Sequence, residues 1–90
     1  MSNRITIKEL EGVCNLLNKL TDSPLEPRVM VDGKRVSQIG NYHLGLAYGR
    51  YGIHRMISTG GAISEPIFSG YRPAREAYDL AHAYIRGLGY

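Results

Sequence analysis

The sequence has very little cysteine, one residue in 90, and no long apolar run. A single cysteine excludes an intramolecular disulfide framework, and with three histidines it is too few for a cysteine-rich zinc site. No apolar stretch approaches the roughly 18 residues of a membrane span, and residues 1–4 do not open a signal peptide. We therefore expect a soluble protein of a reducing compartment, with no membrane partner.

The length and composition indicate one globular domain spanning residues 1–90. Apolar residues make up 43% of the chain and charged residues 21%, which is ordinary for a folded protein and argues against disorder. No internal repeat, linker or low-complexity segment interrupts it. Since so short a chain buries a small core, a partner subunit would help its stability, and we expect a homo-oligomer.

The N-terminal helix has the clearest local signal. Residues 6–9 form a capping box, in which the Thr6 hydroxyl and the Glu9 carboxylate satisfy each other's backbone N–H groups. Residues 22–24 end the helix. Cys14 falls within the apolar stripe and is expected to be a buried apolar residue, not a reactive thiol. The stripe at helical spacing consists of Leu10, Val13, Cys14, Leu17 and Leu20.

A first hairpin is predicted around the turn Asp32-Gly33, whose residues accept positive φ. In that register Val29 pairs with Val36, and the basic residues 34–35 project near the tip.

A second hairpin is predicted from the alternation in residues 42–48 and 51–57, joined by a turn at Gly49-Arg50. This turn would place Gly45 opposite His54. Because alternate residues point to opposite faces, one face is expected in the core and the other is nearly bare of side chains. The predicted core face carries Tyr42, Leu44, Leu46, Tyr48, Tyr51, Ile53 and Ile57, and the bare face carries His43, Gly45, Ala47, Gly52, His54 and Met56.

Arg55 is the exception, because alternation places it on the core side. Either a carboxylate such as Glu76 or Glu9 pairs with it, or the strand bulges near Gly52 and turns it outward; we favour the bulge.

The remaining residues complete an α+β fold. Residues 63–68 form a short strand that Pro66 confines to the sheet edge or cuts, and the last helix runs from Pro73 to a C-terminal cap at Gly87. We predict an N-terminal helix, an antiparallel sheet of three to five strands and a C-terminal helix, with both helices on one face of the sheet.

The middle of the chain is basic and rich in tyrosine. Residues 28–75 carry seven arginines and lysines against two acidic residues. Cations interleaved with aromatic rings suit an anionic partner with π-faces, although a solvated basic surface with half-buried tyrosines would have the same composition. The segment 70–72 before the last helix adds a candidate anion site. The predicted ligand-binding residues are Tyr48, Arg50, Tyr51, His54, Arg55, Tyr71, Arg72 and Arg75.

The bare face of the second hairpin has three readings. Glycine inside a strand costs stability unless a bulge, a ligand or another backbone comes close. The face is therefore a bulged, solvent-facing surface, a contact between two copies of the chain, or a platform for a ligand or partner. The candidate interface residues are His43, Gly45, Ala47, Gly52 and Met56.

No constellation of catalytic residues stands out. His43 and His54 share a face but need a third ligand to hold a metal, and Glu65 is the one nearby candidate. No spacing selects a serine–histidine pair, and no glycine motif matches a phosphate loop or a dinucleotide fingerprint. We expect no catalytic residue, no metal and no cofactor.

Two resemblances bear on identity. The element order is similar to that of the double-stranded-RNA-binding domain, without that family's lysine cluster before the second helix. A second resemblance is carried by residues 8–10, 17–18, 20–21, 40–44, 47–49, 69–71, 75–78 and 85–87. In these segments the sequence resembles a set of small tailed-phage and prophage proteins, from which no site residue is carried over. That resemblance implies a phage gene product acting in the host bacterial cytoplasm.

These observations lead to one functional expectation and a rival. The first is a non-catalytic accessory protein that binds an anionic partner, a nucleotide signal or a nucleic acid, through the basic tyrosine-rich region and so counters host defence. The rival is a protein–protein inhibitor of a host or defence enzyme, acting through the glycine–alanine face or the tip of the first hairpin.

Overall fold

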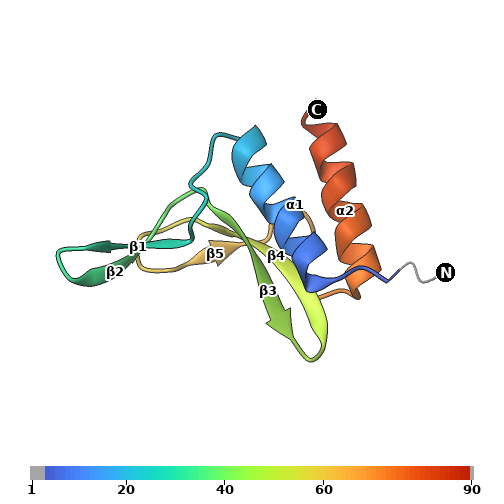
Figure 1. Ribbon diagram of the computed structural model, residues 1–90, viewed down its shortest axis with the longest axis horizontal. Coiled ribbons are helices and arrows are strands. Elements are labelled where there is room, and N and C mark those ends of the chain that lie inside the picture. The colour runs from blue at the N-terminus through green and yellow to red at the C-terminus, as the bar shows by residue number, and fades with distance from the viewer. Residues whose placement is uncertain (1–3, 90) are drawn as a thin grey trace.

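The computed structural model of the protein describes residues 4–89; residues 1–3, on which the expectation about a signal peptide partly rests, and residue 90 lie outside it. The described chain is an α+β domain with a helix at each end, as predicted (Figure 1). In chain order the elements are α1 (Ile7–Leu20), β1 (Arg28–Val31), β2 (Lys34–Ser37), β3 (Tyr42–Ala47), β4 (Arg50–Met56), β5 (Ile63–Ser64) and α2 (Ala74–Gly87).

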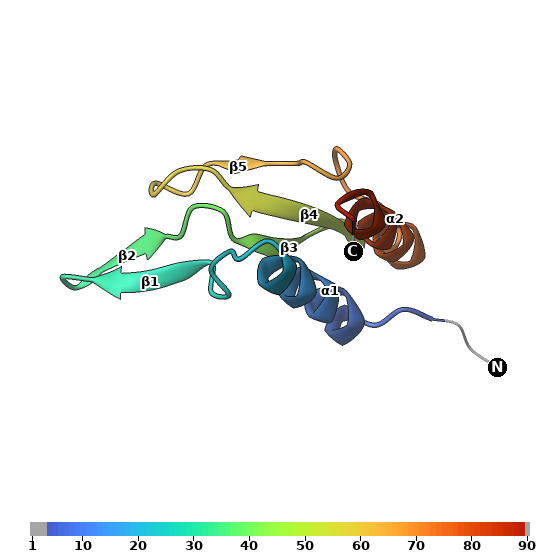
Figure 2. The same cartoon turned by 90° about the horizontal axis from the view of Figure 1, so that it is seen from above.

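The five strands form two separate antiparallel sheets. β1 and β2 pair only with each other, whereas β3, β4 and β5 form a three-stranded sheet in that order. Both helices pack against the larger sheet, α1 on β3 and α2 on β4, and they also contact each other. Figure 2 shows the helices side by side along the sheet and the β1–β2 hairpin extending away from them.

The first helix forms as its sequence predicts. The Thr6 hydroxyl accepts from the backbone N–H of Glu9, and the Glu9 carboxylate accepts from the N–H of Thr6. The apolar stripe faces inward, and Cys14 is buried within it. Burial, with a smaller effect of Glu11, raises the pKa of the Cys14 thiol to about 12, so this side chain carries no thiolate at neutral pH.

The core lies between the two helices and the helix-facing side of β3 and β4. Its members come from both helices, β3 and β4, so these four elements share one core. The buried cluster contains Val13, Cys14, Leu17, Tyr42, Ile53, Ala81 and Ile85.

The last helix starts one residue later than predicted, and its C-terminal glycine cap lies two residues later. Pro73 is the N-cap and the helix begins at Ala74. Gly87 is the final helical residue, Leu88 is the C-cap, and Gly89 takes the left-handed conformation with φ of 94°. The cap was misplaced because both glycines suit a helix C-terminus, and only Gly89 adopts positive φ.

The β1–β2 hairpin has the predicted register. Val29 pairs with Val36 and Val31 with Lys34, around a turn in which both Asp32 and Gly33 have positive φ. Ser37 anchors the hairpin to the body by donating its N–H to the carbonyl of residue 59. We call this hairpin, residues 28–37, the arm.

The predicted register of the β3–β4 hairpin is wrong by two residues. His43 pairs with His54, Gly45 with Gly52 and Ala47 with Arg50, so Tyr48-Gly49 forms the turn in place of Gly49-Arg50. The prediction avoided a bulky residue at positive φ, but Tyr48 adopts φ of 54°. A shift of two residues preserves the faces, because side chains alternate with a period of two.

The predicted core face of this hairpin is buried only in its middle. Tyr42 and Ile53 are buried, whereas Leu46 and Ile57 are more than half exposed and Tyr48 is fully exposed. The hairpin is longer than the helices that cover it, and its tip projects past them (Figure 1).

β5 contains only residues 63–64 and lies at the edge of the larger sheet, so the predicted strand stops before Pro66 as expected. Within residues 4–89, neither helix is long and apolar enough to cross a membrane.

Candidate functional site

The side of β3 and β4 that faces away from the helices gathers most of the predicted interface residues and some of the predicted ligand-binding residues. We call it the open face. Its alternate positions on the two strands are occupied by His43, Gly45, Ala47, Arg50, Gly52 and His54, with Tyr71 leaning over it from the segment before α2.

Three rings form a row across the open face. The centres of the His43 and His54 rings are 5.6 Å apart, and those of the His54 and Tyr71 rings are 5.8 Å apart, both in edge-to-face geometry. His54, in the middle, is buried, whereas Tyr71 remains 36% exposed. The outer members of the row therefore offer ring surface to a ligand, and His54 holds them in place.

The strand glycines make room for this row, so the open face is not bare as predicted. A Cβ at Gly45 would overlap the His54 ring. A Cβ at Gly52 would lie 3.0 Å from the carbonyl oxygen of Gly70 and 3.3 Å from the Tyr71 ring. Both glycines are explained by close approach: the His54 ring lies against Gly45, and the Gly70 backbone and the Tyr71 ring lie against Gly52. A bulge is not needed to explain them.

The open face has few negative charges. β3 and β4 contain no aspartate or glutamate, whereas Arg50 lies at the hairpin tip and Arg28 lies beside His43 at the base of the arm. Neither arginine forms an ion pair with any residue in the described part of the chain. Burial lowers the pKa of His43 below its ordinary value of 6.5, and His54 and Arg28 lower it further. At neutral pH His43 is an uncharged ring beside a cation.

Arg55 does not join the open face. Its Nε donates to the carbonyl of Gly40 at 3.2 Å, and its guanidinium carbon lies 5.0 Å from the centre of the Tyr42 ring. Both expectations for this residue are wrong, because the strand register is unbroken at Gly52 and the carboxylate of Glu76 pairs with another arginine. A cation–π contact and a loop carbonyl accommodate the charge on the helix side.

The arginines before α2 are also engaged elsewhere. The Arg72 backbone bridges to Tyr51 at the edge of β4, and its guanidinium lies 3.6 Å from Glu76. Arg75 lies 3.9 Å from Asp79. All four side chains of these ion pairs are about half exposed, so the pairs are weak but they reduce the local positive charge.

The candidate anion site at residues 70–72 is filled from within the chain. The Gly70 N–H donates to the Glu65 carboxylate, and the Arg72 guanidinium faces Glu76. Two internal carboxylates thus occupy the donors that an external anion would need.

Two further predicted residues lie apart from the ring row. Tyr48 is fully exposed in the turn that precedes Arg50. Met56, predicted as an interface residue, is 1% exposed at the other end of β4 and cannot contact a partner in this conformation. The structure therefore brings Arg50, His54 and Tyr71 together with His43, Gly45, Ala47 and Gly52, and it separates Tyr48, Tyr51, Arg55, Arg72, Arg75 and Met56 from them.

Sequence reasoning missed Asn18, which closes part of the free edge of β3. Asn18 is 1% exposed; its Nδ2 donates to the carbonyl of Tyr42 at 3.0 Å, and its Oδ1 accepts from the N–H of Tyr42 at 2.6 Å. The amide thus takes the place of a neighbouring strand. A polar residue beside the apolar stripe of α1 was the available signal.

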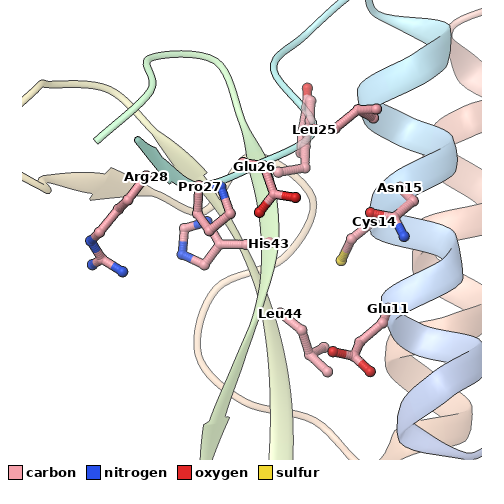
Figure 3. A pocket seen from close by; sticks show the side chains of 10 residues that line it. Glu11, Cys14, Asn15, Leu25, Glu26, Pro27, Arg28, His43 and Leu44 are labelled. Carbon is pink, nitrogen blue, oxygen red and sulfur yellow. The ribbon is translucent and has the colours of Figure 1, made fainter. Parts of the chain in front are cut away.

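A groove of about 420 Å³ runs along the same edge, between α1, β3 and the chain that leads into the arm. Leu44 and Cys14 lie on its helix side and His43 and Arg28 on the other, as Figure 3 shows. Glu11 on α1 and Glu26 before β1 contribute two carboxylates.

Among the described residues, no group of three histidine, cysteine or acidic side chains could hold a metal ion. Comparisons of the chain with protein-family models, with curated proteins and with solved structures give no significant match.

Proposed function

We propose that the protein is a non-catalytic binding protein that holds an anionic ligand with an aromatic base, a nucleotide or a nucleic-acid strand, on its open face. The observation that carries this proposal is the row of His43, His54 and Tyr71 rings over two strands free of acidic residues, with Arg28 beside His43 and Arg50 on the same face at the hairpin tip.

The chemistry of the face fits such a ligand. Bases stack on exposed aromatic rings, and each stacked base contributes about 1–3 kcal/mol. Tyr71 and His43 are the rings with accessible surface, and Arg50 and Arg28 supply cations for phosphate groups. Gly45 makes room for the His54 ring, and the small Ala47 next along the same face keeps the surface low toward Arg50.

The resemblance to tailed-phage proteins supports a place for this activity. We propose an accessory protein in the cytoplasm of the host bacterium, where it would sequester a nucleotide signal of host defence or bind a nucleic acid.

The test uses fluorescence anisotropy over a series of salt concentrations. It measures the binding of labelled single-stranded oligonucleotides and of labelled mono- and cyclic dinucleotides. We expect affinity to fall steeply with salt, with the slope reduced by about one in Arg50→Ala because one phosphate contact is lost. Tyr71→Ala should weaken binding about fivefold or more, and Tyr71→Phe should retain most of it.

Arg86→Ala is the matched control, because it removes the same charge from an exposed position on α2. Loss of binding in Arg50→Ala but not in Arg86→Ala supports the open face. Equal losses in both variants indicate diffuse charge attraction and contradict the proposal. The rival inhibitor would be favoured if no nucleotide probe binds and the protein instead captures one host protein, with a binding that salt does not weaken.

A further inference from the structure

The arm is the least covered part of the described chain. All four residues of β1 are exposed, with Met30 65% and Val31 48% accessible to solvent. It extends along the longest dimension of a molecule that measures 49 × 32 × 22 Å (Figure 1). A two-stranded hairpin without a third strand or a helix against it is marginally stable in water. The arm, with its exposed valine and methionine side chains, would therefore be stabilised by contact with another surface.

The tip of the arm combines this apolar surface with positive charge. Lys34 and Arg35 are exposed there and follow directly after the turn, with Asp32 as the one acidic residue of β1, β2 and their turn. A surface that covers the arm should accordingly be apolar with negative charges at its rim.

The groove along the β3 edge combines apolar side chains with carboxylates in a lining that is more polar than apolar. Leu25, Pro27 and Leu44 give it apolar walls, and Glu11 and Glu26 place two carboxylates beside them. Arg28 and His43 lie on its far side, next to the base of the arm (Figure 3).

We propose that this groove receives the arm of a second copy of the chain, and that the exchange is mutual in a two-fold dimer. Lys34 and Arg35 of each copy would then lie beside Glu11 and Glu26 of the other, and the free edge of β1 would be paired. Arg28 and His43 line both this groove and the edge of the open face, so the two contacts meet there, but the inference is argued from the arm and the groove and does not rest on the proposed ligand.

The chain geometry allows such an exchange. A strand of four residues spans about 13 Å, and the groove segment 25–28 leads directly into β1. Suppose that the two β1 strands run antiparallel, side by side, with Arg28 of one copy opposite Val31 of the other. The arm turn at residues 32–33 of each copy then lies opposite residues 25–27 of the other copy. A single two-fold axis then relates the two copies, and the arm of each copy occupies the groove of the other.

The test is the dimer dissociation constant, measured by sedimentation equilibrium for charge-reversal variants. The arm variant Lys34→Glu/Arg35→Glu and the groove variant Glu11→Lys/Glu26→Lys should each raise the constant about tenfold or more, because like charges then meet. The protein that carries all four substitutions should recover to within about threefold of the original value.

Arg86→Glu and Asp79→Lys are the matched controls, because they reverse the same charges on α2, away from arm and groove. All substituted side chains are exposed, and circular dichroism confirms folding of each variant. A chain that remains monomeric at about 1 mM, near the weak limit of specific association, overturns the inference. The inference is also overturned if the arm and groove variants leave the dimer dissociation constant unchanged. The same holds if the protein with all four substitutions does not recover the original constant.

A second measurement reads the contact directly. Zero-length carbodiimide cross-linking of a mixture of ¹⁵N-labelled and unlabelled protein should join Lys34 to Glu26 or Glu11 in mixed-isotope pairs. Lys34 pairs with Val31, about 10 Å along β1 from Arg28, and the mixed-isotope products separate links between two copies from links within one chain. Cross-links found only within one isotope, or none at these residues, contradict the inference.

Discussion

The two hairpins of this protein share their local chemistry and differ in what covers them. Each is closed by a two-residue turn with positive φ at both positions, 49° and 77° at Asp32-Gly33 and 54° and 72° at Tyr48-Gly49. The β3–β4 hairpin contributes Tyr42 and Ile53 to the core beneath two helices. The arm leaves both faces of β1 and its tip in solvent. Turn chemistry specifies a hairpin, but burial decides whether the hairpin belongs to the cooperative unit.

The largest expected effect separates the two hairpins by truncating one strand residue in each. Ile53→Ala removes a fully buried side chain from the core and should lower the free energy of unfolding by about 2–5 kcal/mol. Val29→Ala, at a position 38% exposed in the arm, should lower it by less than about 1 kcal/mol. Urea unfolding followed by circular dichroism measures both. Similar losses in the two variants would contradict the division into core hairpin and arm.

The next effect concerns the edge of the core hairpin. Asn18→Ala leaves the N–H and carbonyl of Tyr42 without the side-chain partner that they have now, and it should cost about 1–3 kcal/mol. Asn15→Ala, on the exposed side of the same helix, is the control and should change stability by less than about 0.5 kcal/mol. If the two variants unfold at the same urea concentration, the two hydrogen bonds of the Asn18 amide to Tyr42 do not stabilise the edge of β3.

The sequence was most informative where structure depends on neighbouring residues. The capping box at residues 6–9, the helical stripe of α1 and the arm register follow from local spacing, and all are confirmed. The turn of the second hairpin was misplaced because local rules disfavour Tyr48 at positive φ, whereas the pairing of the whole strand requires it there.

The candidate site was less predictable, since it depends on which residues the tertiary structure brings together. Charge counting grouped Arg55 and Arg72 with Arg50, but the fold places the first over Tyr42 and the second beside Glu76. Strand alternation did group His43 with His54, because it depends only on sheet parity. The covering of Gly52 by Tyr71 joins residues from different parts of the chain, and no spacing in the sequence indicates it.

Changing the first turn residue of each hairpin should affect global stability in the core hairpin and only local opening in the arm. Tyr48→Asn replaces a bulky residue at positive φ by one that accepts it, and should raise the free energy of unfolding by about 1 kcal/mol. Asp32→Tyr introduces the same strain in the arm, and should increase hydrogen exchange of residues 29–36 without changing global unfolding. A loss of stability in Tyr48→Asn would show that the exposed Tyr48 ring contributes contacts to the folded chain.

The smallest expected effect connects the two hairpins through Arg28 at the base of the arm and His43 on β3. The folded chain lowers the pKa of His43 below 6.5, chiefly by burial and secondarily by His54 and Arg28. Above pH 6.5 the ring is neutral in both the folded and unfolded states and contributes no pH dependence. As the pH falls below 6.5 the unfolded chain binds the proton more readily, so stability declines until the folded ring is also protonated. His43→Gln should reduce this decline, and Arg28→Ala should move the pKa of His43 upward, both measurable by urea unfolding and by the NMR shift of the His43 Cε1 proton. A His43 pKa at or above 6.5 in the intact protein would contradict the neutral ring on which the proposed stacking surface depends.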